Sequence, residues 1–599
     1  MLRRIALLLL LAGPAAARVV DVPLQLDHAF LRQALLTQVY TLADGTVRVW
    51  DDGSGCNALI LSNPRVESAG ERLRVSSDGI ARIGTAVGER CLNVVDWAGT
   101  VEVLEEPELD STEPLVRFRV VDSHLRDRGG RKRVTGTIWD WVKQYAQPRF
   151  AAVTIDLRQP LAELRAFLPS VLPDGGDAAR RLIDSLHLAA AHVTDTGVRL
   201  DLRFAVAESA LLEEALPPGP EPTLSAAELE AWSAAWEQWD AFVTYVAKQA
   251  AGESAAAQRQ ALFDVLIAAR YDLVAALAPA HAGAPDPIRP LFLATWKRLA
   301  PVLREIALGL PGEAALRYLS FITAADALRA IDQLGPASGL DLSADGLRRL
   351  ARMLAPATDG DPLAWSEDVD PELRQRFDFG APLPPPAPTP DLDVSWWLPR
   401  AAWAADDLAT RLNRWVPGPD DVLQYLPQVR DLLADIADRT LETQTLDAQF
   451  HQLYRWLVPA TAWKESCWRQ FIRVNGTVKP MLSSAGAVGI MQVLPRVWRG
   501  FYDVKGLHQD IAYNAGAGAE ILLHYLRDYA IKRGEHTATG SVDNLARATY
   551  AVYNGGPGHL RRYRKPTKRS LREIDESFWE KYRRIKQGDA LAVAECFGK

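Results

Sequence analysis

Two segments decide the fold of this chain: Trp463-Lys464-Glu465-Ser466 and Ser484-Ala485-Gly486-Ala487-Val488-Gly489-Ile490-Met491-Gln492. The first ends a predicted helix whose apolar side chains would bury one face. These side chains are Leu453, Leu457, Ala460 and Trp463. A glutamate in such surroundings should have a raised pKa, because desolvation disfavours its charged form. A general acid that cleaves a glycosidic bond near neutral pH needs this property. Glu465 is therefore the candidate general acid.

The second segment makes this interpretation more specific. Small residues over 484–487 allow a tight turn or a close backbone approach, and 489–495 predicts a short helix ended by a proline. Later, 549–558 ends a predicted helix in a glycine-rich turn. Met491 could pack against a sugar face or the acid, and the Gln492 amide could bond a sugar hydroxyl or acetamido group. Tyr553 and Asn554 would present a phenol and an amide.

These segments, in this order, resemble the catalytic domain of the soluble-type (SLT) lytic transglycosylases, relatives of goose-type lysozyme. The family pattern is E-S at a helix end, S-x-G-A-x-G-[LI]-M-Q, an N-x-x-x-G helix, and A-Y-N-A-G. The matching residues are Glu465-Ser466, Ser484 through Gln492, Asn514 with Gly518, and Tyr553-Asn554. The resemblance covers 450–599 and implies a lysozyme-like, mostly α-helical catalytic domain.

The resemblance also implies a reaction. Glu465 would protonate the glycosidic oxygen between N-acetylmuramic acid and N-acetylglucosamine. It would then deprotonate the muramoyl O6 hydroxyl, which attacks C1 and gives a 1,6-anhydro product. The substrate would be peptidoglycan glycan strands, and no cofactor is implied. Ser484, Met491 and Gln492 would shape the saccharide subsites, and Tyr553 and Asn554 would contact the sugar or the acid.

One segment imitates a functional motif. Ala512-Tyr513-Asn514-Ala515-Gly516 repeats the last family motif letter for letter. Its distance from Gln492 matches the N-x-x-x-G helix instead. We therefore interpret 512–516 as part of that helix and 553–554 as the functional pair.

The chain departs from the family pattern in three places. The gap between Glu465 and Ser484 is longer than usual, which predicts an inserted loop containing Asn475-Gly476 beside the cleft. Val552 and Gly555 each replace an alanine of the last motif. These departures concern the shape of the subsites more than catalysis.

The sequence shows no second carboxylate in a comparable motif. Glycosidases normally use two, but Asp503 and Asp510 lie in what look like surface segments. A transglycosylase needs one acid, because its nucleophile belongs to the substrate and has a high effective concentration.

Two other functions are compatible with these residues. A hydrolytic, lysozyme-type muramidase would use the same site with water, and a peptidoglycan-binding or scaffold protein would hold glycan without cleaving it. A metal enzyme is not expected, because the histidines are scattered without paired ligand spacing.

The N-terminus predicts a secretory signal peptide over 1–17. Arg3 and Arg4 precede a short apolar run, and the small residues 15–17 form a cleavage site. The alternative, a membrane anchor, would need a run of ~20 apolar residues. We therefore expect an exported, periplasmic protein of the cell envelope.

In an exported protein, the four cysteines are expected to form disulfides. Disulfides form in oxidising compartments, and the simplest of the three connectivities is Cys56–Cys91 with Cys467–Cys596. Four buried thiols are the alternative.

Charge is distributed unevenly along the chain. The formal net charge is −7, but the residues from His451 onward carry +11 and the first 450 carry −18. The densest basic run is 561–569. A basic domain predicts an anionic partner; because the protein is expected to be exported, we expect a wall polymer or lipid headgroup and no nucleic acid. A solvated basic surface is the alternative.

Composition breaks predict a multidomain protein, mainly α with a strand-rich (α+β) N-terminal region. Alternating patterns at 116–120 and 198–204 indicate half-buried strands, and a helical stretch is predicted over 159–188. Apolar side chains that begin at Leu229 and include Trp232, Trp236 and Trp239 have helical spacing, which predicts core packing. Partners in the wall or envelope could bind through 18–378. The predicted segments are 18–218 (strand-rich), 222–378 (helical), 379–394 (proline-rich linker), 395–449 (helical lead-in) and 450–599 (catalytic).

Overall fold

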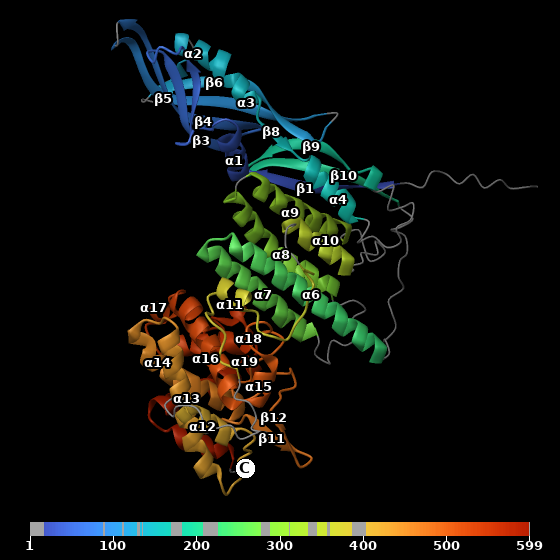
Figure 1. The fold of residues 1–599 in the computed structure, drawn as a ribbon, viewed down its shortest axis with the longest axis vertical. Helices are drawn as coiled ribbons and strands as arrows, with labels where there is room; N and C mark the ends of the chain where they lie inside the picture. Colours follow the sequence, from blue (N-terminus) through green and yellow to red (C-terminus); the bar gives the residue numbers. More distant parts are fainter. Residues whose placement is uncertain are drawn as a thin grey trace, which may run out of the picture. The chain divides into compact units, whose positions relative to one another are not determined.

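The computed structural model describes residues 17–87, 90–110, 113–127, 132–133, 136–168, 183–207, 226–276, 288–310, 312–332, 344–355, 360–385 and 403–597. The chain forms two compact units. The N-terminal unit comprises Met1–Glu221 with Trp296–Leu363, and the C-terminal unit comprises Pro222–Thr295 with Ala364–Lys599. The helical region predicted as one domain over 222–378 is therefore divided between the two units. Figure 1 labels the helices and strands along the chain.

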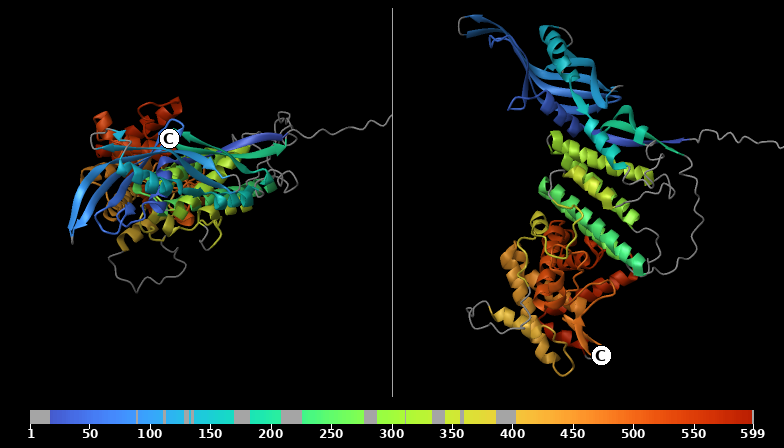
Figure 2. Two further views of the ribbon diagram at one scale, coloured as in Figure 1. Left: turned by 90° about the horizontal axis from the view of Figure 1, so that it is seen from above. Right: turned by 45° about the vertical axis from the view of Figure 1, so that its right-hand side comes forward.

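The N-terminal unit is rich in antiparallel β-structure, which confirms the strand-rich prediction at this level. Its larger sheet has the order β2-β3-β4-β5-β6-β7, with β8 pairing with β6, and its smaller sheet has the order β1-β10-β9. Figure 2 shows the larger sheet as twisted and curved. The strands are β1 (Ala17–Asp27), β2 (Thr46–Asp51), β3 (Ala58–Ala69), β4 (Arg72–Val87), β5 (Arg90–Leu109), β6 (Leu115–Asp127), β7 (Lys132–Arg133), β8 (Thr154–Asp156), β9 (His187–Thr194) and β10 (Gly197–Ala207).

Helix α1 (His28–Gln38) packs on the larger sheet of this unit. The Asp27 carboxylate accepts a hydrogen bond from the Phe30 backbone N–H (2.9 Å) and caps the helix. Leu31 and Leu35 are buried beside side chains of β3 and β4. The other helices of this unit are α2 (Thr137–Trp141), η1 (Val142–Ala146), α3 (Gln147–Ala151), α4 (Arg158–Phe167), α9 (Gly312–Asp332) and α10 (Ala344–Leu354). The unit boundary falls inside α8 (Ile288–Leu308).

The helical stretch predicted over 159–188 is confirmed at its start by α4, which ends at Phe167. It is wrong at its end, because Leu188 lies in β9 and pairs with Leu202 of β10; residues 169–182 lie outside the described part of the chain. Ladder pairing and burial of the β10 side chains override the local helical pattern.

The C-terminal unit is mainly helical, as predicted for this part of the chain. Its long central helices bury apolar faces against one another, and its only described β-structure in named strands is one short hairpin. Its elements are α6 (Ala226–Gly252), α7 (Ala256–Ala276), α11 (Pro371–Arg376), α12 (Trp403–Leu412), α13 (Val422–Thr443), η7 (Ala448–Phe450), α14 (His451–Ser466), β11 (Phe471–Val474), β12 (Thr477–Pro480), α15 (Val504–Gln509), α16 (Ile511–His524), η8 (Tyr525–Ile531), α17 (Glu535–Thr539), α18 (Asn544–Gly555), η9 (Pro557–His559), α19 (Arg569–Lys586) and η10 (Ala590–Cys596).

Helices α6 and α7 share one core with the segment that resembles a catalytic domain. Phe263 of α7 meets Phe501 edge-on, with ring centroids 5.9 Å apart. Arg270, only 1% exposed, donates to the carbonyl oxygens of Val497 and Arg499, each at 2.9 Å. Sequence patterns cannot reveal this association, because it joins residues more than 200 positions apart.

The first residues of the predicted proline-rich linker also pack into this unit. Phe379 is buried, and its ring stacks on His524 with centroids 4.7 Å apart. Arg374 donates to the carbonyl oxygens of Phe379 and Ala381, both at 2.8 Å. Residues 386–394 of the linker lie outside the described part of the chain.

Both predicted disulfides are present, Cys56–Cys91 and Cys467–Cys596. Such bonds are typical of oxidising compartments and agree with export. The predicted signal peptide lies outside the described residues except for Ala17, which begins β1. No helix among the described residues is long and apolar enough to cross a membrane.

Candidate active site

Glu465 lies at the C-terminal end of α14, whose inner face is buried. The helix ends at the next residues because Cys467 adopts a left-handed backbone conformation (φ 53°) and forms the disulfide to Cys596. The Glu465 side chain is half-buried. Burial raises the pKa of this carboxyl above its ordinary value, which is the direction that a general acid requires.

Tyr550 of α18 is the direct partner of this carboxyl. Its hydroxyl donates to Oε1 of Glu465 at 2.7 Å, and its ring stacks on Phe578 of α19 with centroids 4.0 Å apart and planes only 4° apart. The donated hydrogen bond favours the carboxylate and so lowers the pKa of Glu465, but burial is the larger effect. Tyr550 thus has a fixed ring and aims its hydroxyl at the acid.

The sequence analysis did not single out Tyr550, because the motif drew attention to Tyr553. The two tyrosines are three positions apart on one helix and therefore face the same side. Two features of the sequence could have identified Tyr550. One is its three-residue spacing from Tyr553, and the other is that a desolvated carboxyl needs a hydrogen-bond donor.

Tyr553 and Asn554 lie at the end of the same helix. The Tyr553 hydroxyl donates to the Met491 carbonyl oxygen at 2.7 Å, so it supports the second segment instead of bonding Glu465. Burial, and after it the charge of Glu465, raise the pKa of Tyr553. Asn554 is half-buried at the helix end.

The segment 484–492 is a system of turns, and the short helix predicted from Gly489 is wrong. Val488 and Val493 exchange both backbone hydrogen bonds (2.9 and 3.1 Å), which closes a tight turn between them. Gly489 has φ 76°, and a Cβ there would come within 2.3 Å of the Gln470 side chain. Only glycine fits this position.

Ser466 connects the turn to α14, the helix that carries Glu465. Its buried hydroxyl contacts the carbonyl oxygens of Ala462 (3.1 Å) and Ile490 (2.6 Å). Because Ser466 follows Glu465 directly, this contact fixes the end of α14 relative to the turn. This contact explains why a serine follows the glutamate at the end of the helix.

The predicted binding residues of this segment differ in exposure. Met491 is fully buried, whereas Gln492 is half-buried and its amide donates to the Gly489 carbonyl oxygen at 2.8 Å. Ser484 is exposed, and it is the neighbouring Ser483 whose hydroxyl accepts from the Ala487 N–H (3.0 Å).

Asn514 holds the turn from the other side. It is fully buried; its Oδ1 accepts from the Met491 N–H (2.9 Å), and its Nδ2 donates to the carbonyl oxygens of Val488 and Leu507 (2.9 Å each). Residues 512–516 thus lie within α16, and Asn514 is a buried support of the turn. Gly518, four residues on, leaves room for the Met491 side chain.

A residue from outside the segment 450–599 also reaches the site. Tyr271 of α7 is half-buried, and its hydroxyl donates to the Tyr553 carbonyl oxygen at 3.3 Å. Burial, and after it the charge of Glu465, raise the pKa of Tyr271. The position of this tyrosine depends on α7 packing against the C-terminal helices, and no motif marks it.

Three other carboxylates of the C-terminal unit are occupied. Asp575 is buried and accepts from Nε and Nη2 of Arg562 at 3.1 and 2.7 Å. Asp503 caps α15 and Asp510 caps α16, and Asp510 is buried, contrary to the prediction of a surface position. The described residues contain no group of His, Cys, Asp and Glu side chains that could hold a metal ion.

Two departures from the motif pattern have structural explanations. The insertion predicted as a loop is the β11–β12 hairpin, whose Asn475-Gly476 turn has φ 49° and 79°, as in a type I′ turn. At Gly555, an alanine Cβ would lie 2.7 Å from the His559 ring and 2.9 Å from Nη1 of Arg562. Glycine is therefore required there.

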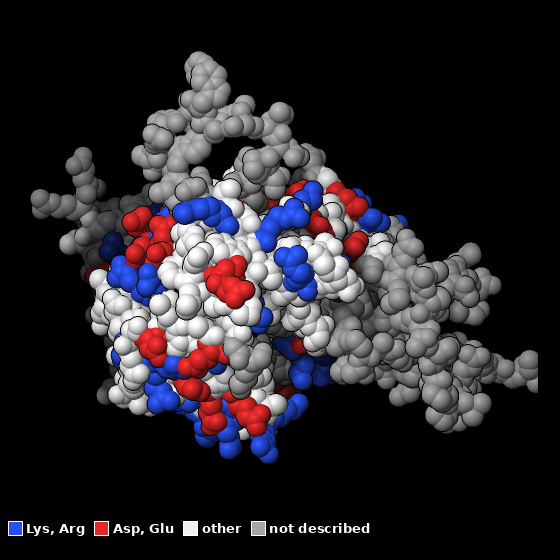
Figure 3. Space-filling view, turned by 90° about the horizontal axis from the view of Figure 1, so that it is seen from below, with Lys and Arg blue, Asp and Glu red and all other residues white. Residues whose placement is uncertain are grey.

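The densest basic run is partly neutralised within the unit. Arg561 and Arg564 pair with Glu535, and Arg562 pairs with Asp575. Figure 3 shows basic and acidic side chains interspersed on the face that it draws. The run therefore presents less free positive charge than its sequence implies.

No protein-family profile, curated protein or solved structure matches the chain. The function must therefore be inferred from the site's own geometry.

Proposed function

We propose that this protein is a peptidoglycan lytic transglycosylase of the cell envelope with Glu465 as its single acid and base. The observation that carries the proposal is the desolvated Glu465 carboxyl, held at a helix end by Ser466 and bonded by the Tyr550 hydroxyl. A solvated surface glutamate would have neither the raised pKa nor a buried donor.

Such a carboxyl can serve both steps of the reaction. Protonated Glu465 gives its proton to the glycosidic oxygen, and the bond from that oxygen to C1 of the muramoyl residue breaks. The Tyr550 hydroxyl then stabilises the carboxylate. The carboxylate takes the proton of the muramoyl O6 hydroxyl while O6 bonds to C1, which restores the acid and consumes no water.

Three occupied carboxylates of the C-terminal unit support this one-acid route. Arg562 holds both oxygens of Asp575, and the caps Asp503 and Asp510 bind backbone N–H groups. None of these carboxylates is free to activate water as the second acid of a hydrolase does.

The test is digestion of purified sacculi by the full chain and by Glu465→Gln. The wild type should release muropeptides with 1,6-anhydro ends, whereas the variant should release none while keeping its circular dichroism spectrum. Mass spectrometry separates the outcomes, because reducing ends carry one additional water and would indicate a muramidase. Cleavage by folded Glu465→Gln would contradict the assignment of Glu465 as the acid. Binding of sacculi by the wild type without any release would indicate a scaffold.

A further inference from the structure

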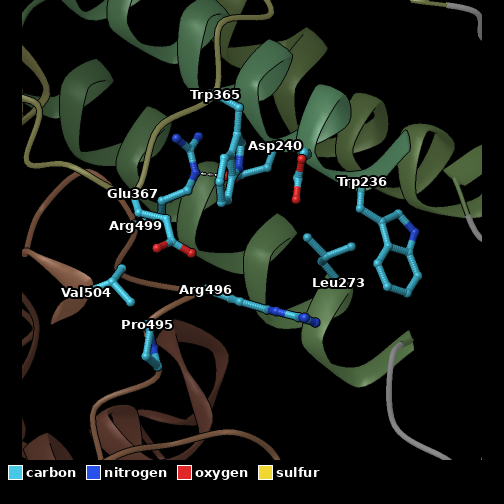
Figure 4. Close-up of a pocket in the computed structure, with 10 residues that line it drawn as sticks. Trp236, Asp240, Leu273, Trp365, Glu367, Pro495, Arg496, Arg499 and Val504 are labelled. Carbon is cyan, nitrogen blue, oxygen red and sulfur yellow. Dashed lines mark hydrogen bonds and ion pairs between the residues drawn. The ribbon is translucent and has the colours of Figure 1, made fainter. Parts of the chain in front are cut away.

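A pocket lies in the C-terminal unit between helices α6 and α7 and the chain that follows the 484–492 turn (Figure 4). Its apolar lining includes Trp236 of α6, Leu273 of α7 and Trp365. The Trp365 residue is 37% exposed. Two indoles and a leucine provide surfaces for an aliphatic or planar ligand group.

The base of the pocket is a closed network of charges. The Asp240 carboxylate accepts from Arg270 (2.7 Å) and pairs with Arg499. Arg499 also donates to the Ser366 carbonyl oxygen (3.1 Å), and its guanidinium lies 5.5 Å from the Trp365 ring centre. These groups are satisfied by one another, so they shape the pocket and do not supply its binding charges.

Three charged side chains at the rim of the pocket do not belong to this network. Arg496, Glu237 and Glu367 line the pocket and are exposed. Within the part of the chain that the structure describes, none of the three makes a side-chain hydrogen bond or ion pair. In Figure 4 the Arg496 side chain extends across the pocket towards Leu273. One free guanidinium thus faces a cavity that also carries two free carboxylates.

We propose that this pocket binds a zwitterionic peptide group, one with a free carboxylate and a free ammonium. Arg496 would bind the carboxylate through two parallel N–H donors, and Glu237 or Glu367 would bind the ammonium. The carbon chain between them would lie against the two indoles, which also attract an ammonium. A simple anion fits less well, because the rim carries two negative charges against one positive.

Two pocket residues are close in sequence to residues of the candidate active site. Arg496 is four residues beyond Gln492, and Leu273 is two residues beyond Tyr271. If the proposed function holds, on which this step rests, the ligand group would belong to the peptide branches of the wall glycan. Binding itself does not depend on cleavage.

The experiment is calorimetric titration of the full chain with the dipeptide alanyl-alanine. We expect saturable binding, as a small ligand in a preformed site should give. Arg496→Gln, and the pair Glu237→Gln with Glu367→Gln, should each weaken it at least tenfold. The N-acetylated and the amidated dipeptides, which lack the ammonium and the carboxylate respectively, should also bind at least tenfold more weakly.

The matched controls are Arg572→Gln and Glu576→Gln, exposed positions on α19 that should leave binding unchanged. Unfolding curves of every variant would show that the fold is intact. The proposal is overturned if the dipeptide does not saturate, if the acetylated form binds equally well, or if the rim variants match the controls. Glu465→Gln should bind the dipeptide like the wild type, so failure here is distinct from failure of the proposed cleavage.

Discussion

At the scale of the single residue, the hydroxyl of Tyr550 lowers the proton affinity that burial gives to Glu465. Tyr550→Phe removes the only donor that bonds this carboxyl among the described side chains, so the pKa of Glu465 should rise further. Because the acid must begin protonated, the alkaline limb of the pH–activity profile should move to higher pH.

The rate at the optimum should fall about 10- to 100-fold, since a hydrogen bond to a charged group is worth ~1.5–3 kcal/mol. The measurement is the rate of sacculus solubilisation between pH 4 and 9. A profile of Tyr550→Phe that coincides with the wild type would contradict the assigned contact.

The Glu465 carboxyl should lower the free energy of unfolding at neutral pH. Burial raises the pKa of Glu465 in the folded protein above its unfolded value, so the folded state binds the proton more tightly. The stability contributed by the protonated form is complete below the unfolded pKa and is lost as pH rises through the folded pKa. Glu465→Gln avoids this loss and keeps an oxygen for the Tyr550 hydroxyl.

Urea unfolding at two pH values measures this effect. At pH 7 the Gln variant should be more stable than the wild type, by on the order of 1 kcal/mol. At pH 3.5 the advantage should disappear. An equal difference at both pH values would mean that Glu465 does not titrate with a raised pKa.

At the scale of the element, α16 is fitted to the turn beneath it. Gly518 lies inside this helix, where alanine would ordinarily stabilise by up to ~1 kcal/mol. Here a Cβ would lie 2.5 Å from Cβ and Cγ of Met491. Gly518→Ala should therefore destabilise by about 1–3 kcal/mol through overpacking and should lower activity by displacing the turn.

Gly558→Ala is the matched control, because nothing lies within 4 Å of its added Cβ. Thermal unfolding and sacculus digestion of both variants would separate the two cases. A stable, active Gly518→Ala would show that the turn can shift without consequence.

At the scale of the whole molecule, the C-terminal unit is built from two distant parts of the chain. Arg270 joins them through Asp240 and the carbonyl oxygens of Val497 and Arg499. Arg270→Met should cost about 3–5 kcal/mol, because it breaks a buried ion pair and leaves carbonyl groups without donors. Activity should fall with it, because α7 also places Tyr271 at the site.

Arg572→Met, at an exposed position of α19, should change stability by less than ~0.5 kcal/mol. Chemical denaturation of both variants is the measurement. A loss below ~1 kcal/mol in Arg270→Met would mean that α6 and α7 are only loosely attached to the C-terminal helices.

Local patterns predicted much of the framework. Period-two alternation located parts of β6 and β10, and helical spacing located α6, α14 and the end of α18. The small number of possible cysteine pairings identified both disulfides. These features depend on neighbours in the sequence or, for the cysteines, on a small number of pairings. The predicted helix at Gly489 failed because Val488 and Val493 bond each other, and a helical pattern does not contain that pairing.

By itself the sequence determined that this chain has a strand-rich first part, a mainly helical remainder and one acid at a helix end. Only the tertiary structure decided what surrounds that acid. Tyr550 as donor, Asp575 as an occupied neighbour and Tyr271 from α7 are set by packing between elements remote in sequence. The physical reason is that desolvation and hydrogen bonding act through space, whereas a motif records only spacing along the chain.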